Sequence, residues 1–141
     1  MPIILDHIVL NVDDIDNMLF FYTTIIGLEP ECVQEYKDGK VIFPSLRINK
    51  DTIIDLFPKN LWKDESEKAN NKGLNHFCLS FDKPDWDEAY KRIKVHNVPI
   101  KEGPVERWGA QGKGISLYVF DPENNQIEIR YYPSKKLSKI L

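Results

Sequence analysis

The sequence predicts an α+β fold made of two copies of one module, each consisting of a strand, a helix and several further strands. The first observation is a repeat, because residues 5–10 (LDHIVL) reappear 69 positions later as residues 74–79 (LNHFCL). A second pair, residues 52–56 (TIIDL) and 125–129 (NQIEI), is offset by 73 positions. Apolar residues at helical spacing follow the first segment of each module, and such repeats indicate a duplicated unit. We expect a single domain over residues 1–141, with modules at 3–57 and 74–132 joined by a linker at 58–73.

The first module is expected to begin with a strand at residues 3–12, followed by a helix. Asp13 and Asp14 suit the N-cap of that helix and the positive end of its dipole, and Gly27 suits the left-handed residue that follows a helix end. Three short strands should follow, the second of them interrupted by Pro44, which is typical of an edge or a bulge. The apolar positions that predict the helix are Ile15, Met18, Leu19, Tyr22, Ile25 and Ile26, and the expected strands are 31–36, 41–48 and 53–57.

The second module is expected to repeat this order after a polar linker that has room for one helical turn. A strand at 74–81 leads to a helix with Pro84 in its first turn, and Asn97-Val98-Pro99 ends that helix. We expect a glycine-rich loop between residues 103 and 114, two final strands and a loose tail. The apolar positions of the helix are Trp86, Ala89, Tyr90 and Ile93, and the final strands are 115–120 and 126–132.

The composition is that of an ordered, soluble globular protein and excludes several functional classes. The 141 residues are 42% hydrophobic and 29% charged, with a net charge of −3, which argues against nucleic acid as a partner. Two cysteines form no disulfide framework and favour a reducing, cytoplasmic compartment. No apolar run approaches the 18 residues of a membrane span, and the N-terminus lacks the basic start of a signal peptide.

Each module places a histidine on its first strand and a carboxylate on its last strand. These residues are His7 and Asp55 in the first module and His76 and Glu128 in the second. Because residues two apart share a face of a strand, the alternate positions are apolar and should pack under the helices, whereas the faces with the histidines and carboxylates should line an open cup. Two half-sheets related by an approximate two-fold axis would bring these four side chains together. Two imidazoles and two carboxylates suit a divalent ion such as Zn, Ni, Co, Mn or Fe.

Simpler interpretations of the same four residues stay open at this point. His7 and His76 could instead be ordinary strand histidines with hydrogen-bond partners. Asp55, near a turn, could be a solvated surface carboxylate. Glu128 lies between two isoleucines, where an unpaired carboxylate would cost several kcal/mol. We therefore expect Glu128 to have a cation or another strong partner.

Arginines and aromatic residues supply candidates for substrate binding. An arginine can meet an anionic group of a substrate or simply be solvated at the surface. Trp108, in the glycine-rich segment, would serve as a lid or as a packed anchor, and two aromatic residues would form an apolar pocket wall. The candidates are the arginines Arg47, Arg107 and Arg130, and the aromatic residues Phe57, Trp108 and Tyr118.

Four segments together resemble the vicinal oxygen chelate superfamily, of the glyoxalase, bleomycin resistance and dioxygenase type. They are residues 5–10 with Phe20-Phe21-Tyr22 and Gly27-Leu28-Glu29, residues 75–79 (NHFCL), the closing segment 121–129 (DPENNQIEI), and residues 103–107 (GPVER), which resemble a loop of bacterial glyoxalase-like members. The resemblance extends over about residues 3–132. It implies paired βαβββ modules that form a cupped mixed sheet around a metal, usually in a homodimer whose site is often shared between subunits.

The resemblance also implies functional residues. His7, His76 and Glu128 stand at positions that ligate metal in such enzymes, and Asp55 stands where glyoxalase I has a glutamate or glutamine ligand, one methylene longer. The leading hypothesis is a glyoxalase I-type lyase or isomerase acting on the hemithioacetal of an α-oxoaldehyde with glutathione or another thiol. The metal would hold two vicinal oxygens and lower the cost of the enediolate, with Glu128, Asp55 or metal-bound water as the base.

Three alternatives remain. A ring-cleaving Fe(II) dioxygenase would hold its iron with two histidines and one carboxylate. Such an enzyme needs a further catalytic histidine, for which only His96 is present. An epoxide-opening resistance enzyme would carry an arginine near residues 115–120, where this chain offers Lys113. A non-catalytic binding module would bind no metal. In each case the partner is a small molecule. The fold by itself does not identify the reaction.

Overall fold

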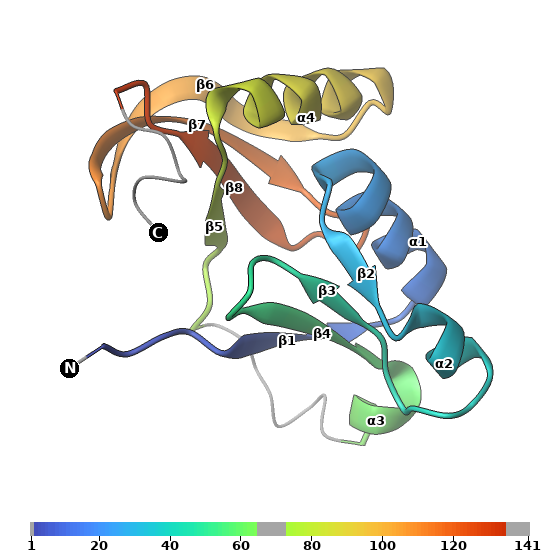
Figure 1. The fold of residues 1–141 in the computed structure, drawn as a ribbon. Coiled ribbons are helices and arrows are strands. Elements are labelled where there is room, and N and C mark those ends of the chain that lie inside the picture. The colour runs from blue at the N-terminus through green and yellow to red at the C-terminus, as the bar shows by residue number, and fades with distance from the viewer. Residues whose placement is uncertain (1, 65–72, 135–141) are drawn as a thin grey trace. The chain divides into compact units, whose positions relative to one another are not determined.

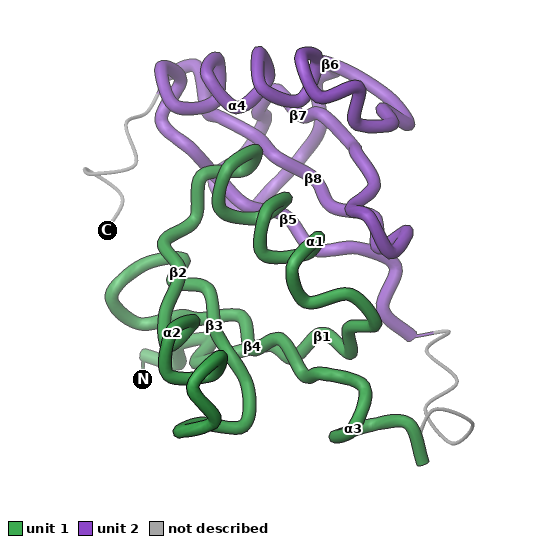
Figure 2. Tube along the Cα trace, turned by 90° about the vertical axis from the view of Figure 1, so that its right-hand side faces the viewer, with its two compact units in different colours: residues 1–71 green, residues 72–141 purple. Residues whose placement is uncertain are grey.

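The computed structural model describes residues 2–64 and 73–134, which belong to two compact units divided between Asn71 and Lys72 (Figure 2). Each unit has a four-stranded mixed sheet, in the order β1-β4-β3-β2 in the first unit and β5-β8-β7-β6 in the second. In both, the first strand runs parallel to the last, and the remaining neighbours are antiparallel. The predicted α+β fold with two βαβββ modules is confirmed.

The first unit follows its predicted order, with one additional short helix (α2) and with the second half of its first helix in the π-helical form. Its sheet pairs β1 with β4 and places β3 between β4 and β2 (Figure 1). Its elements are β1 (His7–Val12), α1 (Ile15–Phe20), the π-helix η1 (Phe21–Ile26), β2 (Glu29–Glu31), α2 (Val33–Lys37), β3 (Ser45–Arg47), β4 (Ile53–Pro58) and α3 (Lys59–Trp62).

Local chemistry explains where the first helix begins and ends. The Asp14 side chain accepts a hydrogen bond from the backbone amide of Asn17 at 3.0 Å, as an N-cap does. Gly27 ends η1 in the left-handed region with φ of 104°. The strand predicted at 31–36 is wrong: Cys32 adopts a left-handed conformation (φ 57°) that ends β2, and a helical turn follows it. The single helical turn predicted after residue 58 is present as α3.

The second unit contains one long helix and a long hairpin. Pro84 lies in the first turn of the helix, as predicted. The glycine-rich loop is wrong, because residues 103–109 belong to a strand and the hairpin turns between Gly109 and Gly112, the latter with φ of 97°. The elements are β5 (Phe77–Ser80), α4 (Lys83–Val95), β6 (Ile100–Gly109), β7 (Gly112–Phe120) and β8 (Gln126–Tyr131). The tail expected after residue 134 and residues 65–72 of the linker lie outside the described residues.

Each sheet has one strongly apolar face, as the alternation predicts. Ile54 and Leu56 of β4 and Ile127 and Ile129 of β8 are fully buried. In the second unit α4 lies over this face, where the indole nitrogen of Trp86 donates to the carbonyl of Ile129 at 3.0 Å. The opposite face of each sheet therefore carries the polar candidates. No helix among the described residues is long and apolar enough to cross a membrane.

Candidate metal centre

The strand register places one histidine and one carboxylate at corresponding positions in both units. In the first unit Val9 pairs with Asp55, and His7 precedes Val9 by two residues. In the second unit Cys78 pairs with Glu128, and His76 precedes Cys78 by two residues. Because residues two apart share a face, each histidine lies on the face of its sheet that carries the carboxylate. The duplication seen in the sequence is thus preserved in the register.

Direct contact between the two candidate ligands is present in the second unit. His76 Nε2 lies 3.0 Å from Glu128 Oε1. The other carboxylate oxygen, Oε2, accepts hydrogen bonds from Ser116 Oγ and Arg130 Nη2, each at 2.6 Å. Glu128 is only 4% exposed. Burial by itself would raise the pKa of the Glu128 carboxyl, but the hydrogen bonds from Ser116 and Arg130 outweigh burial and hold that pKa below its usual range.

Both histidines present the same ring nitrogen, Nε2. His76 Nδ1 lies 2.6 Å from Oδ1 of Asn75, and His7 Nδ1 lies 2.6 Å from Oδ2 of Asp6. In the tautomer with the proton on Nδ1, each ring donates to its neighbour's oxygen. Nε2 is then the nitrogen available to a cation, and an oxygen partner on the opposite nitrogen is the usual support of a metal-binding histidine.

In the first unit the carboxylate is buried and the histidine is exposed. Asp55 is 7% exposed and accepts a hydrogen bond from Ser45 Oγ at 2.7 Å. The pKa of His7 is raised, mainly by its hydrogen bond with Asp6, and the negative charge of Asp55 contributes to the same shift. Asp55 is therefore not a solvated surface carboxylate within this unit.

The donor sets fit a divalent metal. Each unit places one imidazole and one carboxylate on the same face of its sheet, in contact in the second unit, and the described residues contain no group of three or more potential ligands. Imidazole nitrogen and carboxylate oxygen suit Zn, Mn, Fe, Co and Ni, and catalytic sites for these metals commonly use three protein ligands. Neither unit by itself supplies three such ligands among its described residues.

Two candidate substrate residues, Tyr118 and Arg130, lie beside the His76–Glu128 pair. The Tyr118 ring packs edge-on against the His76 ring, with 5.5 Å between centroids, and Tyr118 pairs with Glu128 across β7 and β8. Burial and the negative charge of Glu128 raise the pKa of Tyr118. Arg130 is 4% exposed and contacts Glu128 directly.

The structure places the other candidates in contacts of their own. Arg47 forms a two-pronged ion pair with Glu31, with nitrogen–oxygen distances of 2.7 and 3.1 Å. The Phe57 ring packs against Phe43 with 4.8 Å between centroids. The remaining two lie on β6, where Arg107 is bonded to Glu102 and Trp108 is 75% exposed.

Sequence reasoning missed the residues that hold the candidate ligands in place. Ser45 and Ser116 each donate a hydroxyl to a carboxylate, and Asp6 and Asn75 each support a histidine. The signal for Asp6 and Asn75 was their position, because each directly precedes the histidine of its repeated segment. The serines lie on strands whose register the repeat does not show.

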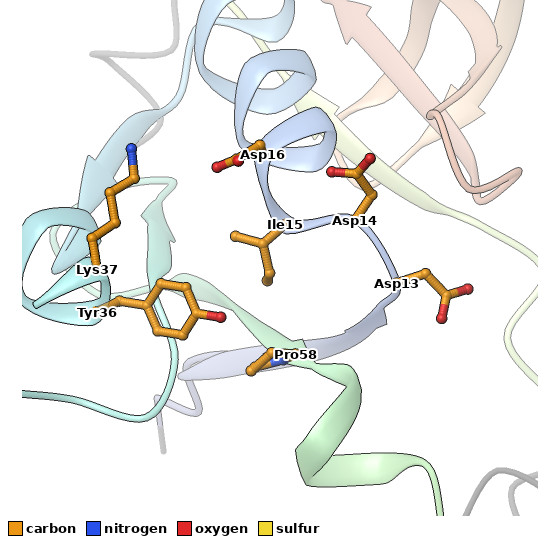
Figure 3. Close-up of a pocket in the computed structure, with 7 residues that line it drawn as sticks. All are labelled: Asp13, Asp14, Ile15, Asp16, Tyr36, Lys37 and Pro58. Atoms are coloured by element: carbon orange, nitrogen blue, oxygen red, sulfur yellow. The ribbon is translucent and has the colours of Figure 1, made fainter. Parts of the chain in front are cut away.

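An open pocket of about 580 Å³ in the first unit contains none of these ligands. It lies at the start of α1 (Figure 3). Two of its carboxylates already have structural partners, because Asp14 caps α1 and Asp13 lies 3.5 Å from Lys59 Nζ. The lining residues are Asp13, Asp14, Ile15, Asp16, Tyr36, Lys37 and Pro58.

The sheet topology and the duplicated strand register define a two-module α+β protein. Residues 4–129 match the family model of the Glyoxalase/Bleomycin resistance protein/Dioxygenase superfamily. The chain belongs to that superfamily, whose members are mostly metal-dependent enzymes, and the resemblance noted in the sequence is confirmed.

Several characterised relatives share nearly the whole domain. Virulence protein STM3117 of Salmonella typhimurium is 30% identical over 128 residues, 91% of this chain and 83% of the relative. Its crystal structure superimposes with a TM-score of 0.72 at 28% identity, covering 94% of this chain and 98% of the other. The fosfomycin resistance protein FosX of Listeria innocua is 30% identical (89% and 86% covered), and the lactoylglutathione lyase of Salmonella typhimurium is 29% identical (87% and 88% covered).

Proposed function

We propose that this protein is a metal-dependent lyase or isomerase of the lactoylglutathione lyase type, acting on the hemithioacetal of an α-oxoaldehyde and a thiol. The observation that carries the proposal is the contact between His76 Nε2 and Glu128 Oε1. The strand register of the other unit places His7 and Asp55 at the corresponding positions. The relationship to a lactoylglutathione lyase at 29% identity supports the choice of reaction.

In this proposal the ligands of the metal are His7, Asp55, His76 and Glu128, supplied as one imidazole and one carboxylate by each module. A divalent ion bound there would act as a Lewis acid and stabilise negative charge on two neighbouring substrate oxygens. The two modules that meet around the ion belong either to one chain or to two subunits, and both arrangements use the same four side chains.

The two carboxylates have different surroundings, which suggests different roles. Glu128 accepts a charged hydrogen bond from Arg130, which holds the carboxylate in place and suits it to the role of a fixed ligand. Asp55 accepts a hydrogen bond from the neutral hydroxyl of Ser45. We therefore assign to Asp55, displaced from the ion when substrate binds, the removal of the proton from the carbon next to the substrate carbonyl and its return to the neighbouring carbon.

Assay of the metal-loaded protein tests this function directly. Protein loaded separately with Zn, Ni, Co, Mn and Fe(II) is incubated with methylglyoxal and glutathione, cysteine or another low-molecular-weight thiol, and thioester formation is followed by ultraviolet absorbance. Thioester formation with at least one metal, lost in His76→Ala, is the expected result. The proposal is wrong if metal-bound protein forms no thioester with any of these thiols.

Opening of an epoxide by water or a thiol is the second candidate, favoured by the 30% identity to FosX over 127 residues. Against it, Lys113, which the sequence offers near the expected arginine position, lies 3.4 Å from Glu106 and has no two-pronged anion clamp. Loss of fosfomycin from a reaction with metal-loaded protein, measured by phosphorus NMR, would select this candidate over the first.

We also propose that the protein is a homodimer. Three consecutive apolar residues near the N-terminus, Ile3, Ile4 and Leu5, are 94%, 59% and 62% exposed in the single chain. Contiguous exposed apolar residues mark interaction surfaces. Light scattering coupled to gel filtration should give twice the chain mass, and Ile3→Ser with Leu5→Ser should shift the equilibrium toward the monomer, whereas a monomeric native protein would contradict this proposal.

The proposed compartment is the cytoplasm. Cys32 and Cys78 are both unpaired and exposed. Exposed free thiols are typical of proteins kept in reducing conditions.

A further inference from the structure

Arg130 is buried on the face of the second sheet that carries the candidate ligands. The Arg130 and Glu128 side chains are each 5% exposed and form an ion pair, with Nη2 at 2.6 Å from Oε2. The same Nη2 donates to the backbone carbonyl of Trp108 at 3.0 Å, and Nη1 donates to the hydroxyl of Tyr132 at 3.3 Å. The guanidinium thus connects Glu128 to the end of the β6–β7 hairpin.

The hairpin end is shaped to hold this guanidinium. A Cβ atom at Gly109 would overlap Arg130 Nη1 and lie only 2.6 Å from Arg130 Cζ and from the Tyr132 hydroxyl. Gly109 is therefore the residue type that leaves space for the arginine. The Tyr132 hydroxyl also accepts a hydrogen bond from the backbone amide of Gln111, at 3.2 Å, so the turn is joined to the same cluster.

A buried ion pair of this kind is a poor source of stability. The cost of removing two charges from water often equals or exceeds their attraction, and an apolar pair of similar volume would serve the fold as well. A function for the pair has to be sought in what it orients. Arg130 holds Oε2 of Glu128, and Oε1 of the same carboxylate faces His76 Nε2 at 3.0 Å.

We infer that Arg130, held by Trp108 and Gly109 at the hairpin end, is a positioning residue that fixes the Glu128 carboxylate for metal binding. This inference rests on the proposed function, because it concerns a ligand of the proposed metal. It assigns Arg130 to the support of a ligand, in place of the substrate contact expected from the sequence. It also makes the β6–β7 turn, which itself contains none of the proposed ligands, a determinant of metal affinity.

The first test is metal binding by a graded set of variants. Arg130→Met removes all the hydrogen bonds of the guanidinium, Arg130→Lys keeps a charge without the planar fork, and Gly109→Ala displaces the guanidinium without changing it. Gly73→Ala is the matched control, because a Cβ there meets nothing within 4 Å. Changes in the outer shell of metal sites typically weaken affinity 10–100-fold.

Zinc and manganese affinities are measured by titration calorimetry on variants whose circular dichroism shows that they are folded. We expect the dissociation constant to rise about 10–100-fold in Arg130→Met, less in Arg130→Lys and Gly109→Ala, and not at all in Gly73→Ala. A merely structural role would lower the melting temperature of these variants and leave the metal affinity of the folded protein unchanged. That result would overturn the inference.

A second readout needs no metal and separates this inference from the proposed function. The ring nitrogens of His76 are observed by ¹⁵N NMR in metal-free native protein, Arg130→Lys, Gly109→Ala and Glu128→Gln. If Arg130 positions Glu128, Arg130→Lys and Gly109→Ala shift the His76 Nε2 signal toward its value in Glu128→Gln. Unchanged His76 signals would refute the positioning role, whereas failure of the native protein to bind any divalent ion would refute only the proposed function.

Discussion

Ser45 donates its hydroxyl to Asp55, with 2.7 Å between Oγ and Oδ1, across the adjacent strands β3 and β4. In the second unit a hydroxyl also reaches the carboxylate across β7 and β8, but diagonally: Ser116 pairs with Arg130, and its Oγ lies 2.6 Å from Glu128 Oε2. Both modules therefore satisfy one oxygen of a buried carboxylate with a hydroxyl from the neighbouring antiparallel strand. The position opposite the carboxylate is a serine in the first unit and Tyr118 in the second, so the two modules reach the same kind of support from different register positions.

Ser116→Ala should destabilise the protein by about 1–3 kcal/mol, because a buried carboxylate oxygen loses a hydrogen bond. The unfolding free energy is measured by urea denaturation. Ser80→Ala is the control, since Ser80 Oγ is buried and has no hydrogen-bond partner among the described residues, so its removal should be neutral or stabilising. Equal destabilisation by the two changes would contradict this account.

Asp55→Asn and Glu128→Gln should separate the base from the fixed ligand. Asp55→Asn is expected to lower the turnover number by about 10²-fold or more while metal remains bound, because a general base contributes on that order. Glu128→Gln should mainly weaken metal binding. Turnover is measured at saturating metal, and the assignment of the base is wrong if Asp55→Asn retains native turnover.

Trp86→Phe should cost about 1–3 kcal/mol of stability, because the carbonyl of Ile129 loses its buried donor. Val95→Ala on the same helix is the comparison. Val95 is 75% exposed, and surface substitutions of this kind usually stay within about 0.5 kcal/mol. Urea denaturation of both variants would show whether α4 is held by this contact, and similar losses in the two would count against it.

The ion pair between Glu31 and Arg47 should make a small, pH-dependent contribution. The hydrogen bond from Arg47 lowers the pKa of Glu31, so this contribution is present above the unfolded pKa of about 4.3 and is lost as the pH falls through the lower folded value. The native protein should therefore exceed Glu31→Gln in stability at pH 7, and this difference should shrink as the pH falls below the unfolded pKa and vanish once Glu31 is protonated in the folded protein. Salt should reduce the difference at pH 7, since the pair is partly exposed. A difference independent of pH would show that the charge of Glu31 is not involved.

The sequence repeat was sufficient to predict the modules and the strands that carry each histidine and carboxylate, and the structure adds their register. The offset between the two histidines carries over into the parallel pairs Val9–Asp55 and Cys78–Glu128 because strand pairing is duplicated with the sequence. The helix caps Asp14 and Gly27 were likewise predictable, since each has a strong local preference for its backbone conformation.

Elsewhere local signals were misleading because tertiary structure overrode them. Glycines near residues 103–114 indicated a loop, yet Gly109 provides clearance for Arg130, and a Cβ at Gly114 would approach the carbonyl of Tyr131 to 2.9 Å. Such close approach inside a hairpin leaves no local pattern. The contact between Glu128 and Arg130 could have been predicted, because residues two apart share a face of a strand. The burial of both depends on the hairpin and could not.

The central claim is that one histidine and one carboxylate from each module bind one divalent ion. Elemental analysis combined with titration calorimetry of the native chain, His7→Ala and His76→Ala measures it most directly. The account predicts one transition-metal ion per chain in the native protein and a loss of at least 100-fold in affinity in either variant, with the fold retained by circular dichroism. A native protein that binds no divalent ion, or two histidine variants that bind it as tightly as the native protein, would contradict it.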